Sequence, residues 1–178
     1  KSLFETSTID VTGSFNPEDI SNSTFSVTSI SARTLSKIRG ENIASTIQNI
    51  PGINNLSTGN SIGKPIIRGL TSQSVLVVQD GVKHESQQWG DEHAPEISLF
   101  DLERIEILRG PASLMYGADG IGGVINIISK PIQFSSGKSP VKYGNLDLNG
   151  YSMNSEGAGN LMLGYGTLNF GIKGYAGY

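Results

Sequence analysis

The stretch Leu102-Glu-Arg-Ile-Glu-Ile-Leu-Arg-Gly-Pro111 alternates apolar and charged residues and then stops at a glycine and a proline. Alternation with a period of two is typical of a β-strand with one buried face, and it places Ile105 and Ile107 on the inner side. Gly110-Pro111 ends the strand, and a proline suits the first position of a helical turn over residues 112–116. The stretch therefore predicts one strand of a sheet, followed directly by a tight change of chain direction.

Further strands are expected on both sides of this stretch. Residues 24–30 alternate in the same way, and the apolar run over residues 74–79 predicts a buried strand that ends at Asp80-Gly81. A last strand is expected over residues 120–128, where the chain enters through several glycines.

Two short helices are expected between the first two strands. The first covers residues 32–39, with Ser31 as its cap and Gly40 at its end. The second covers residues 42–49 and stops before Pro51, which cannot continue a helix. Short strands and short helices in mixed order predict an α+β fold with a small mixed sheet.

The last part of the chain follows a different pattern. Residues 141–178 contain three alternating stretches, in which apolar residues share one side and polar residues share the other. The wall of a membrane β-barrel has this pattern, and so does an ordinary antiparallel sheet with one solvated face. Taken alone, the pattern favours the ordinary sheet. Residues 134–140 are small and turn-forming, and we interpret them as a linker.

The composition excludes several classes of protein. A net charge of −3 and the absence of cysteine among 178 residues argue against a broad nucleic-acid-binding surface, a disulfide scaffold and thiol catalysis. No apolar run reaches the ~18 residues of a transmembrane helix. The start of the chain lacks a basic and then apolar segment, so we expect any signal peptide to be already removed. The glycines of residues 117–123 lack the Gly-Lys-Ser/Thr of a phosphate loop, which argues against nucleotide binding.

Several motifs occur in a fixed order along residues 24–133. They are Ile50-Pro-Gly-Ile53, Ile67-Arg-Gly69, Val78-Gln-Asp-Gly81, Leu102–Pro111 and Tyr116-Gly-Ala-Asp-Gly-Ile-Gly-Gly-Val-Ile-Asn-Ile-Ile-Ser-Lys130. In this order they resemble the plug domain of TonB-dependent outer-membrane receptors, and residues 141–178 resemble the first strands of the barrel of that family. One departure is Gln79, because the family usually has an apolar residue before Asp-Gly.

The resemblance implies an architecture and a location. We expect an α+β plug over residues 24–133, a flexible segment over residues 1–23, a linker over residues 134–140 and the first strands of a 22-stranded transmembrane β-barrel over residues 141–178. Three strands leave two open edges, so we expect the chain to be part of a longer receptor. The receptor is expected in the outer membrane as a monomer, in contact with lipid and with its own barrel, and without a nucleic-acid partner.

The resemblance also implies a segment that binds TonB. Ile9, Asp10, Val11 and Thr12 match the TonB box of the family in position and pattern. An extended, unpaired and alternating segment is what strand addition to the sheet edge of a partner requires. On composition alone, the same residues are expected to be a frayed terminus.

Charged residues of the plug are expected to pair with acids of the barrel. The resemblance assigns this role to Arg68 and Arg109, with Glu103 and Glu106 nearby in sequence. An unpaired arginine inside a barrel lumen would be unfavourable, because it would be partly desolvated. The alternative is that these residues form the solvated faces of edge strands.

The stretch of residues 84–96 is the most informative one for ligand choice. In the family it forms an apical loop of the plug that faces the ligand, and it contains both histidines of this chain. Imidazole and carboxylate groups together suit Zn, Ni or Cu, although histidines nine residues apart match no standard chelate spacing. Three alternatives stay open: a plain polar loop, binding of a metal ion or metal complex, and stacking of Trp89 on a porphyrin or aromatic siderophore. The candidate ligand residues are His84, Glu85, Gln88, Trp89, Asp91, Glu92, His93, Glu96 and Phe100.

These observations predict the plug of an importer that uses TonB for the energy-coupled uptake of a metal ion or metal complex, such as an iron–siderophore complex, haem, Zn, Ni or Cu. The alternatives are a receptor for a non-metal nutrient and a signalling receptor with the same plug. No Ser-His-acid set with suitable surroundings is present, so we expect no enzyme activity, no catalytic residues and no required cofactor.

Overall fold

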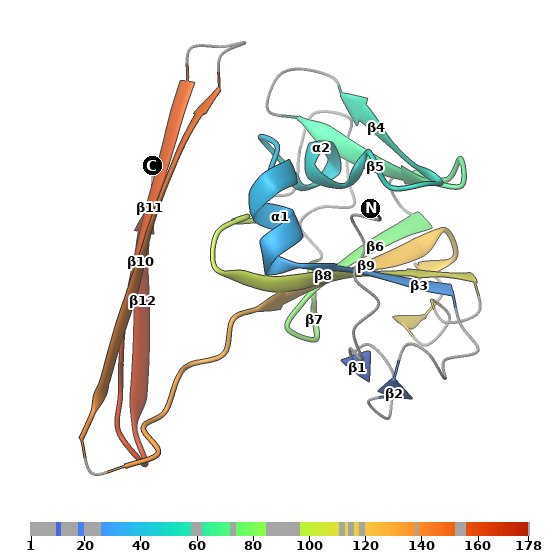
Figure 1. Ribbon diagram of the computed structural model, residues 1–178. Coiled ribbons are helices and arrows are strands. Elements are labelled where there is room, and N and C mark those ends of the chain that lie inside the picture. Colours follow the sequence, from blue (N-terminus) through green and yellow to red (C-terminus); the bar gives the residue numbers. More distant parts are fainter. Residues whose placement is uncertain are drawn as a thin grey trace. The chain divides into compact units, whose positions relative to one another are not determined.

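The computed structural model describes residues 10–11, 18–19, 26–57, 62–71, 74–84, 97–110, 113, 116–117, 120–137, 139–151 and 156–177. The chain divides into two compact units, Lys1–Ser129 and Lys130–Tyr178, which are described separately below (Figure 1). Within the described ranges, no helix is long and apolar enough to cross a membrane.

The first unit is built on a mixed five-stranded sheet. In sheet order its strands are β3 (Ser26–Ser31), β8 (Leu102–Arg109), β9 (Gly123–Ser129), β6 (Val75–Gln79) and β7 (Val82–Lys83). All neighbouring strands are antiparallel except β6 and β9, which are parallel. The mixed sheet confirms the expected α+β class.

Both faces of this sheet are buried, whereas the alternation predicted only one. The face toward the helices carries the main apolar cluster, which includes Ile105, Ile107 and Ile125, all 0% exposed. The opposite face carries a smaller cluster formed by Leu76, Val78, Leu108 and Val124, with Val27 and Tyr116 packed against it. Glu106 lies on this second face and is also 0% exposed. A charged residue in the alternating pattern is therefore not a solvated one here.

Two short helices pack on the first face (Figure 1). The helix α1 spans Ala32–Ile38 and α2 spans Ile43–Ile47, so both are shorter than expected. Ser31 occupies the cap position of α1 without a capping hydrogen bond. Gly40 does not take a positive φ. A Cβ on Gly40 would meet the Ser45 side chain, so its role is close approach rather than a left-handed turn.

The start of α2 is fixed by a capping box. The Asn42 side chain accepts a hydrogen bond from the Ser45 amide at 2.9 Å, and the Ser45 hydroxyl accepts one from the Asn42 amide at 3.0 Å. Ile43, Ala44 and Ile47 are buried, as the expected apolar face requires. Gly52 after the helix takes φ +80°, which suits the predicted turn.

A hairpin between α2 and β6 is not apparent from the sequence. It consists of β4 (Ile53–Ser57) and β5 (Gly63–Ile67), which pair antiparallel. The apolar pattern of both strands is interrupted by Asn54, Asn55 and Pro65, so the sequence does not predict them. Ile53 and Ile67 nevertheless join the core cluster that contains α2.

The N-terminal part of the first unit contains two strands of two residues. Asp10–Val11 (β1) pairs antiparallel with Glu18–Asp19 (β2). The expectation that Asp10 and Val11 are unpaired is therefore wrong, because their backbone groups have a partner a short way along the chain. Ile9 and Thr12 of the expected TonB box lie outside the described residues.

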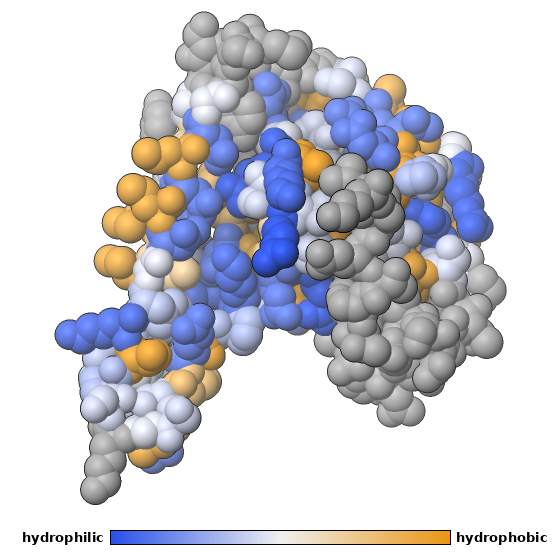
Figure 2. All heavy atoms as spheres, viewed as in Figure 1, coloured by the Kyte–Doolittle hydropathy of each residue, from blue (hydrophilic) through white to orange (hydrophobic). Residues whose placement is uncertain are grey.

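The second unit contains three antiparallel strands, β10 (Val141–Tyr151), β11 (Glu156–Gly166) and β12 (Gly171–Gly177). Leu146 lies opposite Leu161, and the alternation puts the leucines of both strands on one face. Leu148 and Leu163 on this face are 75% and 61% exposed. Apolar side chains gather over these strands in Figure 2.

The residues before β10 lie across the other face of β11 and β12. We call Lys130–Ser135 the strap. The Ser135 amide donates to the Thr167 carbonyl at 3.1 Å, and the Lys173 ammonium donates to the Lys130 carbonyl at 2.7 Å. A Cβ on Gly166 would meet the Gln133 carbonyl, and one on Gly171 would meet Ile132. The glycines thus leave room for the strap.

Candidate functional site

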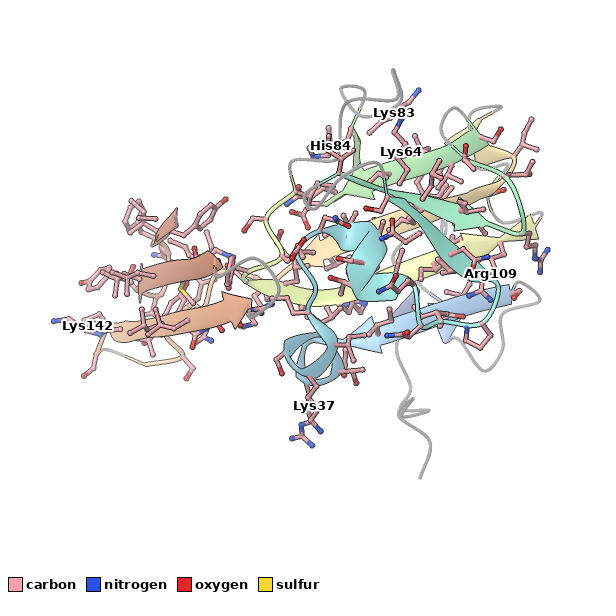
Figure 3. All side chains as sticks on the ribbon, turned by 90° about the horizontal axis from the view of Figure 1, so that it is seen from above. Lys37, Lys64, Lys83, His84, Arg109 and Lys142 are labelled. Carbon is pink, nitrogen blue, oxygen red and sulfur yellow. The ribbon has the colours of Figure 1, made fainter. Side chains whose placement is uncertain are left out.

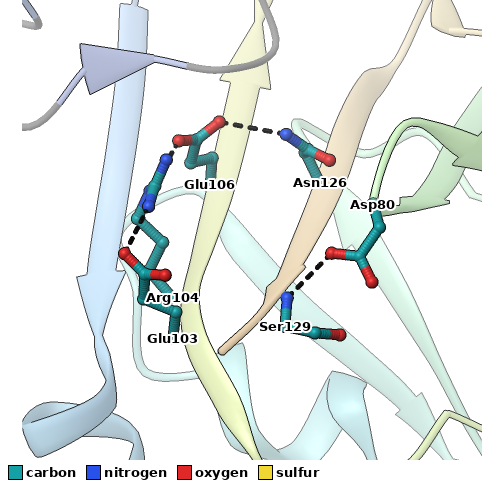
Figure 4. Close-up of polar contacts among 6 residues, drawn as sticks. All are labelled: Asp80, Glu103, Arg104, Glu106, Asn126 and Ser129. Carbon is teal, nitrogen blue, oxygen red and sulfur yellow. Dashed lines mark hydrogen bonds and ion pairs between the residues drawn. The ribbon is translucent and has the colours of Figure 1, made fainter. Parts of the chain in front are cut away.

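A charged network crosses the second face of the five-stranded sheet (Figure 4). The Arg104 Nε donates to Glu106 Oε1 at 2.9 Å, and its Nη1 donates to Glu103 Oε1 at 2.9 Å. Asn126 Nδ2, on the neighbouring strand β9, donates to Glu106 Oε2 at 3.0 Å. Glu106 therefore has a donor on each carboxylate oxygen, which a buried charge needs.

The partner of both glutamates is Arg104, which the family motifs do not single out. Glu103 and Glu106 were expected among the residues of the plug–barrel ion pairs, and within the described residues both form ion pairs with Arg104. The spacing of Arg104 and Glu106 by two residues puts both on one face of a strand and would have indicated the pair. The contribution of Asn126 depends on strand register and has no such signal.

Arg68 and Arg109 form a cationic end of the first unit. Arg68 has φ +51°, an uncommon conformation for a residue other than glycine, and its amide donates to the Gly52 carbonyl at 3.1 Å. Burial lowers the pKa of Arg109, and the positive charge of Arg68 lowers it further. The two guanidinium groups therefore repel each other in this unit.

Arg109 also has unsatisfied donors. Its Nε and Nη2 are buried and have no hydrogen-bond partner among the described residues. Unpaired buried donors of a charged group are unfavourable, so this end of the unit favours a carboxylate or another anion.

A separate group of polar contacts surrounds the turn between β6 and β7. Asp80 and Gly81 have φ +48° and +82°, so the hairpin turn expected from Asp-Gly is present. The Asp80 side chain accepts a hydrogen bond from the Ser129 amide at 2.9 Å (Figure 4). Gln79 Oε1 lies 3.2 Å from His84 Nε2, and Gln79 Nε2 lies 3.5 Å from Ser129 Oγ. His84 and Arg109 lie well apart in Figure 3.

Most of the candidate ligand residues fall outside the described part of the chain. These are Glu85, Gln88, Trp89, Asp91, Glu92, His93 and Glu96. Among the residues that the structure describes, no group of three or more His, Cys, Asp or Glu side chains could hold a metal ion. Of the candidates, the structure thus places His84 and Phe100.

Phe100 has a partner within its own unit. The Arg39 guanidinium carbon lies 4.6 Å from the centre of the Phe100 ring, within the range of a cation–π contact. The ring face is therefore shared with a cation of the plug, and its expected part in a ligand pocket stays a prediction.

Comparison with known proteins identifies the family. The TonB-dependent receptor plug domain model matches residues 19–124. A vitamin B12 transporter of Photobacterium profundum is 32% identical over 120 residues, which cover 67% of this chain and 20% of that protein. An iron-regulated outer membrane virulence protein of Vibrio cholerae is 33% identical over 133 residues, which cover 71% of this chain and 20% of that protein.

Solved structures share the fold. A ferric enterobactin receptor variant of Pseudomonas aeruginosa matches with a TM-score of 0.64 and 24% identity, over 85% of this chain and 24% of that one. A copper transporter matches with a TM-score of 0.64 and 19% identity, over 79% of this chain and 21% of that one.

The chain spans about a fifth of the length of the curated relatives it matches. One of these relatives is named as a transporter and the other as an outer-membrane protein, and the solved structures include a receptor and a transporter rather than an enzyme. The ordered motifs, the mixed sheet with its short helices and the family match agree, and they show that the chain belongs to the TonB-dependent outer-membrane receptors and contains their plug domain.

Proposed function

We propose that this chain is the plug and the start of the barrel wall of an outer-membrane importer, which takes up a metal ion or metal complex with energy delivered through TonB. The observation that carries the plug assignment is the cationic end formed by Arg68 and Arg109. Arg109 has buried guanidinium nitrogens without a partner in the described residues. A plug surrounded by a barrel would receive the missing carboxylates from the barrel wall.

The second unit supports the wall assignment. One face of its strands exposes leucines, and the other carries the asparagines and Asp147. A transmembrane barrel requires this division, with the apolar face toward lipid and the polar face toward the lumen. The full barrel of 22 strands would be completed by strands from the rest of the receptor.

TonB would act on the N-terminal segment. Asp10–Val11 forms only a two-residue ladder with Glu18–Asp19, so the strand of a partner can replace it at the expense of few hydrogen bonds. Ligand binding above the plug would make this segment available on the periplasmic side. The plug would then yield locally, because its elements are short.

The cargo is proposed from the residue types of the 84–96 stretch and from the relatives. Two matched proteins are named for ferric enterobactin and copper, whereas others are named for vitamin B12. Vitamin B12 is itself a cobalt complex, so it falls within the proposed class of cargo, and the second candidate is a nutrient without a metal.

Uptake by cells that carry the full receptor tests the proposal. Radiolabelled zinc, copper, ferric siderophore and vitamin B12 are offered to cells with and without TonB. We expect accumulation of one metal cargo only when TonB is present. Equal accumulation in both strains would contradict the proposal, and accumulation of none of these cargoes would contradict it in favour of the second candidate.

A double variant tests the role proposed for the cationic end. Arg68→Ala with Arg109→Ala removes both cations that are proposed to hold the plug in the barrel. We expect this receptor to become leaky, with higher ion conductance in planar bilayers. The control is Arg33→Ala, which removes an exposed cation from α1 and should leave conductance unchanged. Equal conductance of the double variant and the control would refute the proposal that Arg68 and Arg109 pair with carboxylates of the barrel wall.

A further inference from the structure

His84 stands at one corner of the five-stranded sheet, next to three other polar residues. We call Gln79, Asp80, His84 and Ser129 the hairpin corner. The His84 amide donates to the Val77 carbonyl at 3.0 Å, which extends the β6–β7 ladder by one residue. Gln79 lies two residues after Val77 on the same face, so its side chain can reach the His84 ring diagonally across the hairpin.

The hairpin corner is tied to the end of β9. The Asp80 amide donates to the Ile127 carbonyl at 2.9 Å, and the Asp80 carboxylate accepts from the Ser129 amide at 2.9 Å. These bonds fix the turn, and thereby the backbone on which Gln79 and His84 stand. The Gln79 side chain then spans the distance from Ser129 Oγ to the His84 ring.

The Gln79 carboxamide selects one tautomer of His84. Its nitrogen faces Ser129 Oγ, and its oxygen faces His84 Nε2 at 3.2 Å. A carbonyl oxygen can only accept a hydrogen bond, so Nε2 must carry the proton. In the neutral ring the lone pair is then on Nδ1, for which no hydrogen-bond partner occurs among the described residues. Metal-binding histidines are commonly prepared in this way, with the second nitrogen donating to an oxygen.

We propose that His84 Nδ1 is a ligand for a divalent transition-metal ion and that Gln79 is the positioning residue that keeps this nitrogen unprotonated and aimed. The inference deepens the proposed function, because it assigns one donor atom for the metal cargo. Neutral imidazole nitrogen suits Zn²⁺ and Cu²⁺.

The choice of nitrogen also favours a small ion over a planar complex. Nδ1 is bonded to the ring carbon that carries Cβ, so it lies close to the main chain of its own hairpin. A small ion can approach a nitrogen in that position. A porphyrin ligated through Nδ1 would bring its wide ring against the backbone. The geometry therefore predicts binding of the bare divalent ion rather than haem at His84.

Titration of the full receptor in detergent with ZnCl₂ tests this inference. Gln79→Leu removes the acceptor and leaves a shorter, apolar side chain, and we expect zinc affinity to fall by about 10- to 100-fold. His84→Ala should lower it at least as much. Gln79→Glu, which retains an acceptor for Nε2–H, should keep wild-type affinity or exceed it. The control is Gln48→Leu, the same change at an exposed position after α2, which should leave affinity unchanged.

Nitrogen NMR of the histidine rings provides a readout that a merely structural role would not move. The His84 signal is identified by its loss in His84→Ala. We expect the Nε2–H tautomer in the metal-free wild type and a mixture of tautomers in Gln79→Leu. Haem binding, measured in parallel, should be the same in the wild type and in both variants.

The outcomes separate this inference from the proposed function. Three results would each overturn the inference and leave the proposal of TonB-dependent uptake intact. They are unchanged zinc affinity in His84→Ala, a wild type that binds neither Zn²⁺ nor Cu²⁺, and a metal-free His84 ring that is protonated on Nδ1. If the affinity pattern holds but no uptake depends on TonB, the metal ligand stands and the import proposal fails.

Discussion

At the scale of single residues, Glu106 shows how a sheet interior can hold a charge. Its two carboxylate oxygens accept from Arg104 and Asn126, and its side chain is fully buried. Glu103 binds the same arginine, but its side chain is 44% exposed. The two glutamates therefore form a matched pair, with one shared partner and different burial.

Glu106→Gln should destabilise the plug far more than Glu103→Gln. The amide nitrogen of the new side chain would face a donor, whether it points to Arg104 or to Asn126, and Arg104 would lose its buried counter-ion. We expect a loss of about 3–5 kcal/mol for position 106 and of about 0–1 kcal/mol for position 103. Amide hydrogen exchange in β8 and β9 of the receptor measures the loss of stability in each variant. Equal losses at the two positions would contradict the difference that we expect between buried Glu106 and exposed Glu103.

Tyr116 gives a prediction for alkaline pH. Burial raises the pKa of this phenol above its ordinary value of 10.0, and the negative charge of Glu106 raises it further. The folded state then keeps a proton that the unfolded state has lost. The stabilisation is complete below pH 10 and disappears as the pH rises through the folded-state pKa.

Tyr116→Phe should remove this alkaline loss of stability. The ultraviolet titration of the wild type minus that of the variant should show one phenol that ionises above the other tyrosines. A difference curve with the midpoint of an exposed tyrosine would show that Tyr116 is not shielded.

At the scale of elements, the strap and the glycines beneath it depend on each other. Gly166→Ala would drive a methyl group into the Gln133 carbonyl. The strap must then move, at a cost of about 1–3 kcal/mol. Gly174→Ala, on β12 with open space around the added Cβ, is the matched control and should be neutral or slightly stabilising.

Exchange of the Ser135 amide reports on the strap, because this amide donates to Thr167. We expect faster exchange in Gly166→Ala and no change in Gly174→Ala. Equal exchange rates in the two variants would mean that the strap does not rest on these glycines.

The elements with regular alternation could be predicted from the sequence. The strand around residues 102–109 and the Asp80-Gly81 turn depend on local patterns, and both are present. The hairpin of β4 and β5 could not be predicted, because Asn54, Asn55 and Pro65 break its pattern and its burial depends on packing into the core that contains α2.

The candidate site was predictable in its residue types but less so in its contacts. The Arg68–Arg109 repulsion requires two motifs from different elements to meet, and the Glu106–Asn126 bond requires the β8–β9 register. Gln79 stood out in sequence only as a departure from its family. Its contact with His84 depends on the diagonal geometry of a hairpin, and the alternation of apolar and polar residues in the sequence gives no information about such a contact.

At the scale of the whole molecule, we expect uptake to depend on the N-terminal segment and ligand affinity not to depend on it. Val11→Pro removes a backbone donor that strand addition to TonB needs. We expect uptake to be lost while ligand affinity stays at the wild-type value. Uptake assays with parallel binding measurements check this.

Asp19→Pro is the control for that variant. It disturbs the intramolecular partner of Asp10 and leaves the proposed TonB segment itself unchanged. Uptake should persist in this variant. Persistent uptake in Val11→Pro would refute the assignment of the segment.

The strand order of the plug has a mechanical consequence. Within the five-stranded sheet, the strand that comes first in the chain is β3, which lies at the edge, and Ser26 at its start pairs with Arg109. Tension applied from the N-terminal side would therefore act first on β3, which is held in the sheet by one neighbour, β8. The last strand of this sheet along the chain, β9, has a neighbour on each side. A pull from the N-terminus thus acts on a strand that is paired on one side, and a pull from the other end acts on a strand that is paired on both.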